Sequence, residues 1–242
     1  MNMSIFMAEL VGTFLLILLG DGVVANVTLN KSGMKGAGSI QITLAWGLAV
    51  MLPAFTFGTA SGAHFNPALT IALAADGSVA WADVPTYILG QMLGAFLGAV
   101  LVYLLFVNHF KATDEVAVQR GCFCTAPSVR NTASNLLSEI VGTFVLVFTI
   151  KGIGQVASIA SGVNYLLVFG IIVSIGMSLG GLTGYAINPA RDLGPRIAYA
   201  VLPFKSKDPD WGYSWIPVVG PIIGGLLAVA LYGYLTTLPA FI

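Results

Sequence analysis

The sequence has 242 residues, of which 57% are hydrophobic and only 8% are charged. A water-soluble core of ordinary proportions cannot cover this much apolar surface, so we expect lipid to be the solvent. Ten basic and ten acidic side chains give a net charge of zero. This balance excludes a basic face for nucleic acid and a polybasic segment for lipid headgroups.

Six stretches are long and apolar enough to cross a bilayer, which requires ~20 such residues. They lie at roughly 6–27, 40–57, 84–107, 136–156, 165–182 and 215–235. No basic residue precedes the first stretch, and Glu9 lies inside it, so we expect this span to be retained rather than cleaved as a signal. Cys122 and Cys124 are too close in sequence for a mutual disulfide and too few for a zinc site, which predicts free loop thiols.

Two motifs recur in the same order along the chain. Glu9-Leu-Val-Gly-Thr-Phe returns as Glu139-Ile-Val-Gly-Thr-Phe, an offset of 139 − 9 = 130 residues. Gly62-Ala-His-Phe-Asn-Pro-Ala returns as Gly184-Tyr-Ala-Ile-Asn-Pro-Ala, an offset of 188 − 66 = 122 residues. Each copy brings three spans, and an odd number makes the second copy cross the membrane in the opposite direction. We therefore expect one domain, 1–242, with inverted repeats at approximately 5–107 and 136–236 and a linker at 108–135.

Each Asn-Pro-Ala sequence starts a segment that is too short to span. The apolar run after Asn66 ends at Ala75, and at ~1.5 Å per residue it crosses about half of a ~30 Å core. Asn188 starts a similar segment, 189–199, in which we expect a Gly-Pro pair to cause distortion. Asn is a strong helix cap and Pro suits the first helical turn, so both segments are predicted to begin as helices. Inversion makes these two helix starts meet in mid-bilayer, where their positive dipole ends repel cations and the Asn amides donate to a passing oxygen.

On these paired motifs the sequence resembles the aquaporin and aquaglyceroporin, or major intrinsic protein, family over residues 9–232. The resemblance implies an all-α membrane protein with six transmembrane helices plus two re-entrant half-helices. These would form an inverted 3+3 repeat in the right-handed bundle of aquaporins. It also implies a passive channel for small uncharged solutes, with glycerol and water as partners, protons and ions excluded, and neither cofactor nor metal.

The family pattern assigns pore-lining roles to ten positions of this chain. The Asn-Pro-Ala motifs are Asn66, Pro67, Ala68, Asn188, Pro189 and Ala190, and the selectivity filter is Trp46, Gly176, Tyr185 and Arg191. Water-selective members generally place His where this chain has Gly176, so Gly176 is expected to leave room for a wider solute. Trp46 and Tyr185 would offer an apolar corner and Arg191 hydrogen bonds to hydroxyls, which suits a polyol. Glycerol facilitators often carry Phe in place of Tyr185, so water, hydrogen peroxide or a small undissociated acid stay open as alternatives.

The resemblance also indicates four structural supports. Glu9 and Glu139 correspond to buried carboxylates that accept hydrogen bonds from the backbone of the two loops. His64 corresponds to a side chain that steadies the first loop, although a satisfied buried histidine explains it equally well. Asp192 follows the glycerol-type pattern, and pairing between Asp192 and Arg191 is an alternative explanation of the intramembrane arginine.

Two other functional classes are weaker. A secondary transporter also uses inverted repeats, but the spans contain no pair of carboxylates for proton coupling, and Glu9, Asp21 and Glu139 lie toward span ends. For a membrane enzyme, the nearest catalytic-looking motif is Gly152-Ile-Gly-Gln-Val-Ala157. It loosely matches a dinucleotide-binding turn, but no strand precedes it.

The family further implies a multi-pass protein of the cell membrane with cytoplasmic termini and a homotetrameric assembly. The glycine faces at Gly90, Gly94, Gly98, Gly220 and Gly224 would allow close helix contacts. The loop charges disagree with this orientation, because only Lys151 lies toward the terminal side. The opposite side carries Lys31, Lys35, Lys111, Arg120, Arg130, Lys205 and Lys207. The positive-inside rule would reverse the protein, and we keep the orientation of the family.

Overall fold

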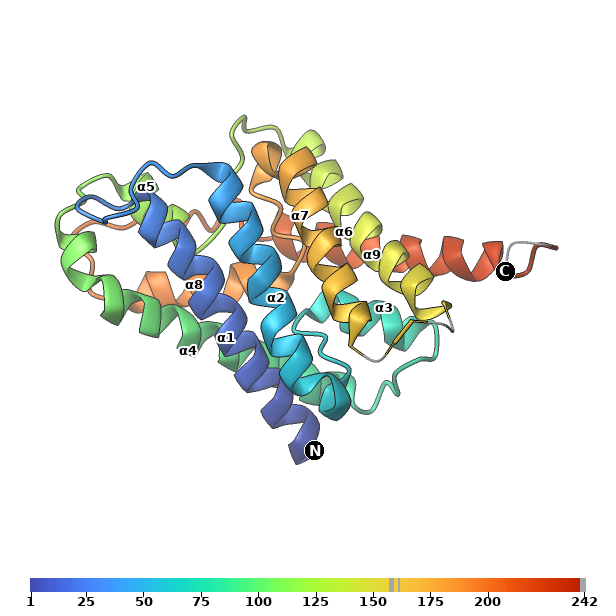
Figure 1. Ribbon diagram of the computed structural model, residues 1–242. Helices are drawn as coiled ribbons and strands as arrows, with labels where there is room; N and C mark the ends of the chain where they lie inside the picture. Colours follow the sequence, from blue (N-terminus) through green and yellow to red (C-terminus); the bar gives the residue numbers. More distant parts are fainter. Residues whose placement is uncertain (157–158, 161, 240–242) are drawn as a thin grey trace.

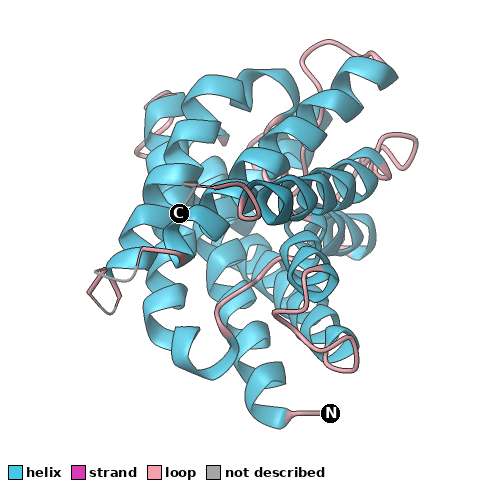
Figure 2. Ribbon diagram, turned by 90° about the vertical axis from the view of Figure 1, so that its right-hand side faces the viewer, coloured by secondary structure: helices cyan, strands magenta, loops and turns pink. Residues whose placement is uncertain are grey.

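The computed structural model describes residues 1–156, 159–160 and 162–239, and its regular elements in these ranges are all helices (Figures 1 and 2). Six of them are long and apolar enough to cross a membrane: α1 (Met3–Thr28), α2 (Ser39–Ser61), α4 (Val84–Lys111), α6 (Thr132–Gly154), α7 (Val163–Thr183) and α9 (Ile216–Leu235). Each overlaps one predicted stretch, so the predicted all-α membrane fold is confirmed.

Two shorter helices begin at the Asn-Pro-Ala sequences. Helix α3 (Pro67–Ala75) has the predicted bounds, and α8 (Pro189–Val201) is longer than predicted by 201 − 199 = 2 residues. Helix α8 continues through its Gly-Pro pair. The glycine has a packing role: a Cβ at Gly194 would lie 2.5 Å from Ala95 Cβ, so the absence of a side chain lets α8 approach α4. In Figure 1, α3 and α8 run outward in opposite directions from the middle of the molecule. A further short helix, α5 (Val116–Gly121), was not predicted.

The long helices pack in two similar pairs through glycine. Helix α1 packs against α4, and α6 packs against α9. A Cβ at Gly94 would lie 2.2 Å from Leu10 O, and one at Gly224 would lie 2.2 Å from Ile140 O. The half-helices complete the bundle, since α3 packs on α9 and α8 packs on α4. The glycine faces are thus occupied within the chain and do not provide a surface for another subunit.

The bundle is apolar outside and partly polar inside. Leucines spaced along α2, such as Leu44, Leu48 and Leu52, are exposed, as expected for side chains that face lipid. Several charged side chains are instead completely buried: Glu9, Asp21, Glu139, Asp192 and Arg196. Charged groups at membrane depth are costly unless they are paired or face a polar path, so these residues indicate where the functional site lies.

Candidate functional site

The two loops that lead into α3 and α8 have the same unusual backbone. Ala63 and Phe65 have φ values of 54° and 48°, and the corresponding Tyr185 and Ile187 have 37° and 43°. Residues other than glycine rarely adopt this left-handed region, which costs of order 1–3 kcal/mol each and persists only where the surroundings enforce it. Both loops must therefore be held by strong contacts.

Two buried glutamates provide these contacts. Glu9 Oε1 accepts from His64 N at 3.0 Å, and Glu9 Oε2 accepts from Phe65 N at 2.7 Å. The hydroxyl of Ser61 also donates to Glu9 Oε1, at 2.5 Å. Glu139 holds the second loop in the same manner through Ala186 N (3.1 Å), Ile187 N (2.8 Å) and Thr183 Oγ1 (2.7 Å). Each carboxylate therefore fixes consecutive backbone N–H groups just before an Asn-Pro-Ala sequence.

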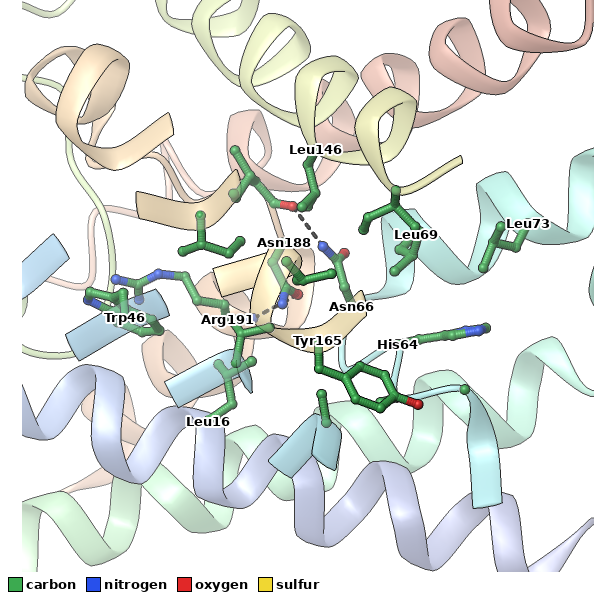
Figure 3. Close-up of a pocket in the computed structure, with 18 of the residues that line it drawn as sticks. Leu16, Trp46, His64, Asn66, Leu69, Leu73, Leu146, Tyr165, Asn188 and Arg191 are labelled. Carbon is green, nitrogen blue, oxygen red and sulfur yellow. Dashed lines mark hydrogen bonds between the residues drawn. The ribbon is translucent and has the colours of Figure 1, made fainter. Parts of the chain in front are cut away.

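The asparagines connect the two loops to each other. Asn66 Nδ2 donates to Ile187 O at 2.8 Å (Figure 3), and Asn188 Nδ2 donates to Phe65 O at 2.8 Å. Their Oδ1 atoms cap their own helices by accepting from Ala68 N and Ala190 N, which confirms both predicted helix starts. An amide nitrogen carries two protons, so each asparagine keeps one N–H for a solute in the cavity that both residues line.

His64 belongs to the cavity wall and is also satisfied. Its Nδ1 lies 3.0 Å from Thr70 Oγ1, and its ring stacks on Tyr87 at 4.5 Å between centroids. Gln91 Nε2 donates to both Thr70 Oγ1 and Glu9 Oε2. The first loop is therefore supported by a network in which Glu9 is the charged member.

Two cavities meet at a constriction. The inner cavity, of about 300 Å³, contains both asparagines, and the outer cavity has a volume of about 730 Å³. Trp46, Tyr185 and Arg191 line both cavities, so these three side chains lie where the two join. Gly176 lines the outer cavity. The structure thus brings the four predicted filter residues together.

Arg191 lies flat against Trp46 at this constriction (Figure 3). Its Cζ is 3.9 Å from the centre of the Trp46 ring, a cation–π contact. Its Nη1 donates to Asp21 Oδ1 at 3.3 Å and to Phe123 O at 3.4 Å. Among the described residues Nε and Nη2 have no hydrogen-bond partner, so these nitrogens are available to a solute.

Gly176 lets two side chains pack closely beside it. A Cβ at this position would lie 2.6 Å from Thr43 Cγ2 and 2.9 Å from Tyr185 Cζ, so neighbouring side chains already fill the space beside it. A Cβ at Gly180 would likewise lie 2.7 Å from Tyr185 Cδ1. The two glycines therefore let the Tyr185 ring lie back against α7. Its hydroxyl is buried beside Thr43 and has no hydrogen-bond partner of good geometry in the described part of the chain.

Asp192 supports the second loop region but does not pair with Arg191. Its Oδ1 accepts from Arg196 Nε at 2.8 Å, and its Oδ2 accepts from Thr125 N at 2.8 Å. Arg196 also donates to Thr125 O at 2.9 Å. The alternative in which Asp192 neutralises Arg191 is therefore wrong, because Asp192 is saturated by Arg196 and Thr125 while Arg191 contacts Asp21.

Thr43 and Gly180 were not singled out from the sequence, and Asp21 was named only as an acid toward the end of its span. For Asp21 a signal did exist, because an acidic residue within a span requires a named partner. The two cysteines are free as predicted, and they are buried. Burial raises the pKa of Cys122 to about 12, so its thiol stays protonated and unreactive.

The described residues include no group of three His, Cys, Asp or Glu that could hold a metal ion. The dinucleotide-like sequence gives no sign of a nucleotide site either. Gly152 and Gly154 lie in the last turn of α6, and Ala157 lies outside the described residues.

Comparison with known proteins gives consistent matches over nearly the whole chain. The family model described as major intrinsic protein matches residues 1–232. The chain is 55% identical to the "probable glycerol uptake facilitator protein" of Thermotoga maritima, over 96% of this chain and 100% of that protein. It is 52% identical to the glycerol uptake facilitator protein of Bacillus subtilis, over 95% of this chain and 84% of that protein. The crystal structure of the aquaglyceroporin from Plasmodium falciparum superposes with a TM-score of 0.83 at 31% identity, covering 95% of this chain and 94% of that one.

Proposed function

The chain belongs to the major intrinsic protein family, and we propose on that premise that it is a passive channel for glycerol and water that excludes protons and ions. The observation that carries the proposal is the constriction of Trp46, Tyr185 and Arg191 between two cavities. Channels and glycerol facilitators of this family are transporters rather than enzymes.

The constriction offers opposite chemistry on its two sides. The rings of Trp46 and Tyr185 provide an apolar surface for the carbon atoms of a polyol, while Arg191 Nε and Nη2 donate to its hydroxyls. Beyond them, the second N–H groups of Asn66 and Asn188 continue the row of donors. Apolar side chains also line the inner cavity: Leu16, Val50, Leu69, Leu146, Val168 and Ile172. An amphipathic path of this kind suits a solute with hydroxyls along one edge.

Protons and cations meet two barriers at the asparagines. The N-termini of α3 and α8 face each other there, and each carries roughly half a positive charge. The Asn66 and Asn188 amides donate to the oxygen of a passing water and so orient it, which hinders a continuous proton wire. This part of the site needs no contact specific to glycerol.

The acids within the bundle are engaged in ways that disfavour proton-coupled transport. Glu9 and Glu139 accept from loop N–H groups, Asp21 contacts Arg191, and Asp192 contacts Arg196. A coupling carboxylate must bind and release a proton during transport, which these contacts oppose. Glycerol flux should therefore be linear in concentration and independent of a proton or sodium gradient.

Stopped-flow light scattering on proteoliposomes tests the function directly. Glycerol and water permeability should both exceed those of empty liposomes, and permeability no higher than in empty liposomes would reject the channel. Tyr185→Phe should change the ratio of glycerol to water permeability by less than about twofold, since the hydroxyl that it removes is buried beside Thr43 and does not face the solute. The matched control is Tyr234→Phe, on the exposed surface of α9, which should leave the ratio unchanged.

We also propose the inverted repeats 5–107 and 136–236, the linker 108–135 and a homotetramer with one pore per subunit. The matching helix pairs, α1 with α4 and α6 with α9, support the repeats. The exposed leucines of α2 provide an apolar surface that either lipid or another copy can cover. Light scattering of the detergent-solubilised protein would give the subunit number, and a monomeric mass would contradict the tetramer.

Cytoplasmic termini remain our proposal for the orientation. Three of the basic loop residues that argue against it are engaged locally: Arg120 with Asp208, Arg130 with Asp210, and Lys207 with the carbonyl groups at the end of α8. These residues present less free charge than a count of the sequence suggests.

Cysteine labelling can determine the orientation without interference from the native thiols, which are buried. Gly33→Cys lies in the exposed loop after α1, where a side chain meets nothing within 4 Å, and Ser78→Cys lies in the exposed loop after α3. A membrane-impermeant maleimide added to intact cells should label Gly33→Cys and should label Ser78→Cys only after permeabilisation. The reverse pattern would overturn the orientation.

A further inference from the structure

Two neighbouring residues of α1 form the back of the filter. A Cβ at Gly20 would lie 2.2 Å from Trp46 Cζ3, so only glycine allows the Trp46 ring to lie against α1 here. The next residue, Asp21, places Oδ1 3.3 Å from Arg191 Nη1. One turn of α1 therefore contacts both partners of the Trp46–Arg191 stack, from the side opposite to the solute.

The surroundings of Asp21 make this contact specific. Asp21 is completely buried, and its Oδ2 has no hydrogen-bond partner among the described residues. Arg191 is the cation that it contacts, the thiol of Cys122 is a neighbouring titratable group, and Asp192 is a more distant acid already bound to Arg196. A buried carboxylate at membrane depth is costly, and one side chain that it contacts here is the arginine at the constriction.

We propose that Asp21 is a positioning residue that determines the ion selectivity of the filter: it holds Arg191 against Trp46 and cancels the guanidinium charge where the two cavities join. This inference rests on the proposed channel function. A guanidinium is always protonated, so without Asp21 the constriction would carry an uncompensated positive charge that attracts small anions. With an ionised Asp21 against Arg191, the constriction still offers Nε and Nη2 as donors but carries no net charge, which favours neutral hydroxyl compounds over ions of either sign.

Nitrate is the probe for this charge, because it is a small planar anion that matches the guanidinium fork and has no undissociated form near neutral pH. Glycerol flux into proteoliposomes is measured with nitrate or with bulky gluconate at the same ionic strength. The glycerol permeability of wild type should be the same in nitrate and in gluconate. Asp21→Asn should become sensitive to nitrate, which should inhibit its glycerol flux at concentrations at least about tenfold lower than any that affect wild type. Asp76→Asn is the matched control, since it breaks another ion pair on the terminal side of the protein, and it should behave as wild type.

Three further variants separate charge compensation from a purely structural role. Asp21→Glu keeps the charge and should stay insensitive to nitrate. Asp21→Asn combined with Arg191→Met should also be insensitive, because the attracting charge is gone. Arg191→Met alone leaves Asp21 uncompensated and should leak protons, detected with a trapped pH-sensitive dye, whereas the double variant should leak less. This last comparison tests the proposal even if Asp21→Asn does not fold.

The outcomes that overturn the inference are distinct from failure of the channel function. Equal nitrate sensitivity in Asp21→Asn and Asp76→Asn would reject it, as would nitrate sensitivity that persists after Arg191→Met. Equal proton leak in Arg191→Met and the double variant would reject it too. Failure of the channel function would instead appear as wild-type glycerol permeability no higher than that of empty liposomes, before any salt is changed.

Discussion

The two Asn-Pro-Ala loops share one frame but differ in what surrounds it. In both, a buried glutamate fixes the backbone, and an asparagine caps a half-helix and donates to the opposite loop. Beyond this frame the residues diverge. The position three residues after the asparagine is Leu69 in the first half and Arg191 in the second, and the next position is Thr70 or Asp192.

The difference shows how one duplicated frame carries two tasks. The shared part sets the two helix starts against each other, and both halves contribute to it in the same way. The divergent part gives only the second half an arginine at the constriction, and it replaces the neutral support of Thr70 with the charged support of Asp192 and Arg196. The filter arginine and the charged support beside it therefore come from the second half alone.

The largest expected effect tests whether the charged support of the second half-helix is stronger than the neutral support of the first. Asp192→Asn would leave Arg196 buried without its counter-charge, and breaking such a pair costs about 3–5 kcal/mol. Thr70→Val at the matching position removes only neutral hydrogen bonds, at about 1–3 kcal/mol. Unfolding measured in detergent should therefore rank Asp192→Asn as clearly less stable. Equal losses would mean that the charged network does not hold the second half-helix more firmly than the neutral one holds the first.

The next effect tests the shared frame. Glu9→Gln and Glu139→Gln each replace a carboxylate oxygen by an amide group that cannot accept from a loop N–H, and each should cost about 1–3 kcal/mol and lower glycerol permeability. The two losses should be alike because both glutamates bind the same loop positions. Glu115→Gln, in the exposed linker, is the control and should change the stability by under about 0.5 kcal/mol. A loss more than twice as large at one glutamate would break the equivalence of the loops.

The sequence was sufficient for what is local or repeated. Hydropathy located the six spans, and Asn followed by Pro located both half-helix starts, because capping depends on neighbouring residues. Helix α5 was missed, since its six residues carry no periodic signal long enough to detect. The Gly-Pro pair led us to expect a distortion in α8, but its glycine serves the close contact with α4.

The candidate site was predictable in its members but not in its contacts. The family pattern supplied Trp46, Tyr185 and Arg191, which the structure places together at the constriction. Asp21 and Arg191 are 170 residues apart, so no local pattern could reveal their contact. That Gly176 leaves room for a wider solute stays a prediction, and only the packed structure shows that Tyr185 and Thr43 fill the space beside it.

The smallest expected effect compares the outer ends of the two half-helices. The C-cap of α3 is Asp76, an acid at the negative end of a helix dipole, and Lys151 contacts Asp76 Oδ2 at 2.7 Å. At the end of α8, the ammonium group of Lys207 instead donates to Ala200 O and Leu202 O. Partial burial tends to raise the pKa of Asp76, but hydrogen bonds from Lys151 and Ser78 outweigh it and hold the pKa below its ordinary value.

These two ends should respond differently to acid. Because the pKa of Asp76 is lowered in the folded protein, its pair with Lys151 stabilises above about pH 4 and is lost as the pH falls through the folded pKa. Lys151→Met should cost up to about 1 kcal/mol at neutral pH and nothing once Asp76 is protonated. Lys207→Met, which removes a cation from carbonyl groups, should cost a similar amount at both pH values. Unfolding of wild type and both variants in detergent at pH 7 and pH 3 measures this, and a loss for Lys151→Met that does not change with pH would show that Asp76 is not the group it stabilises.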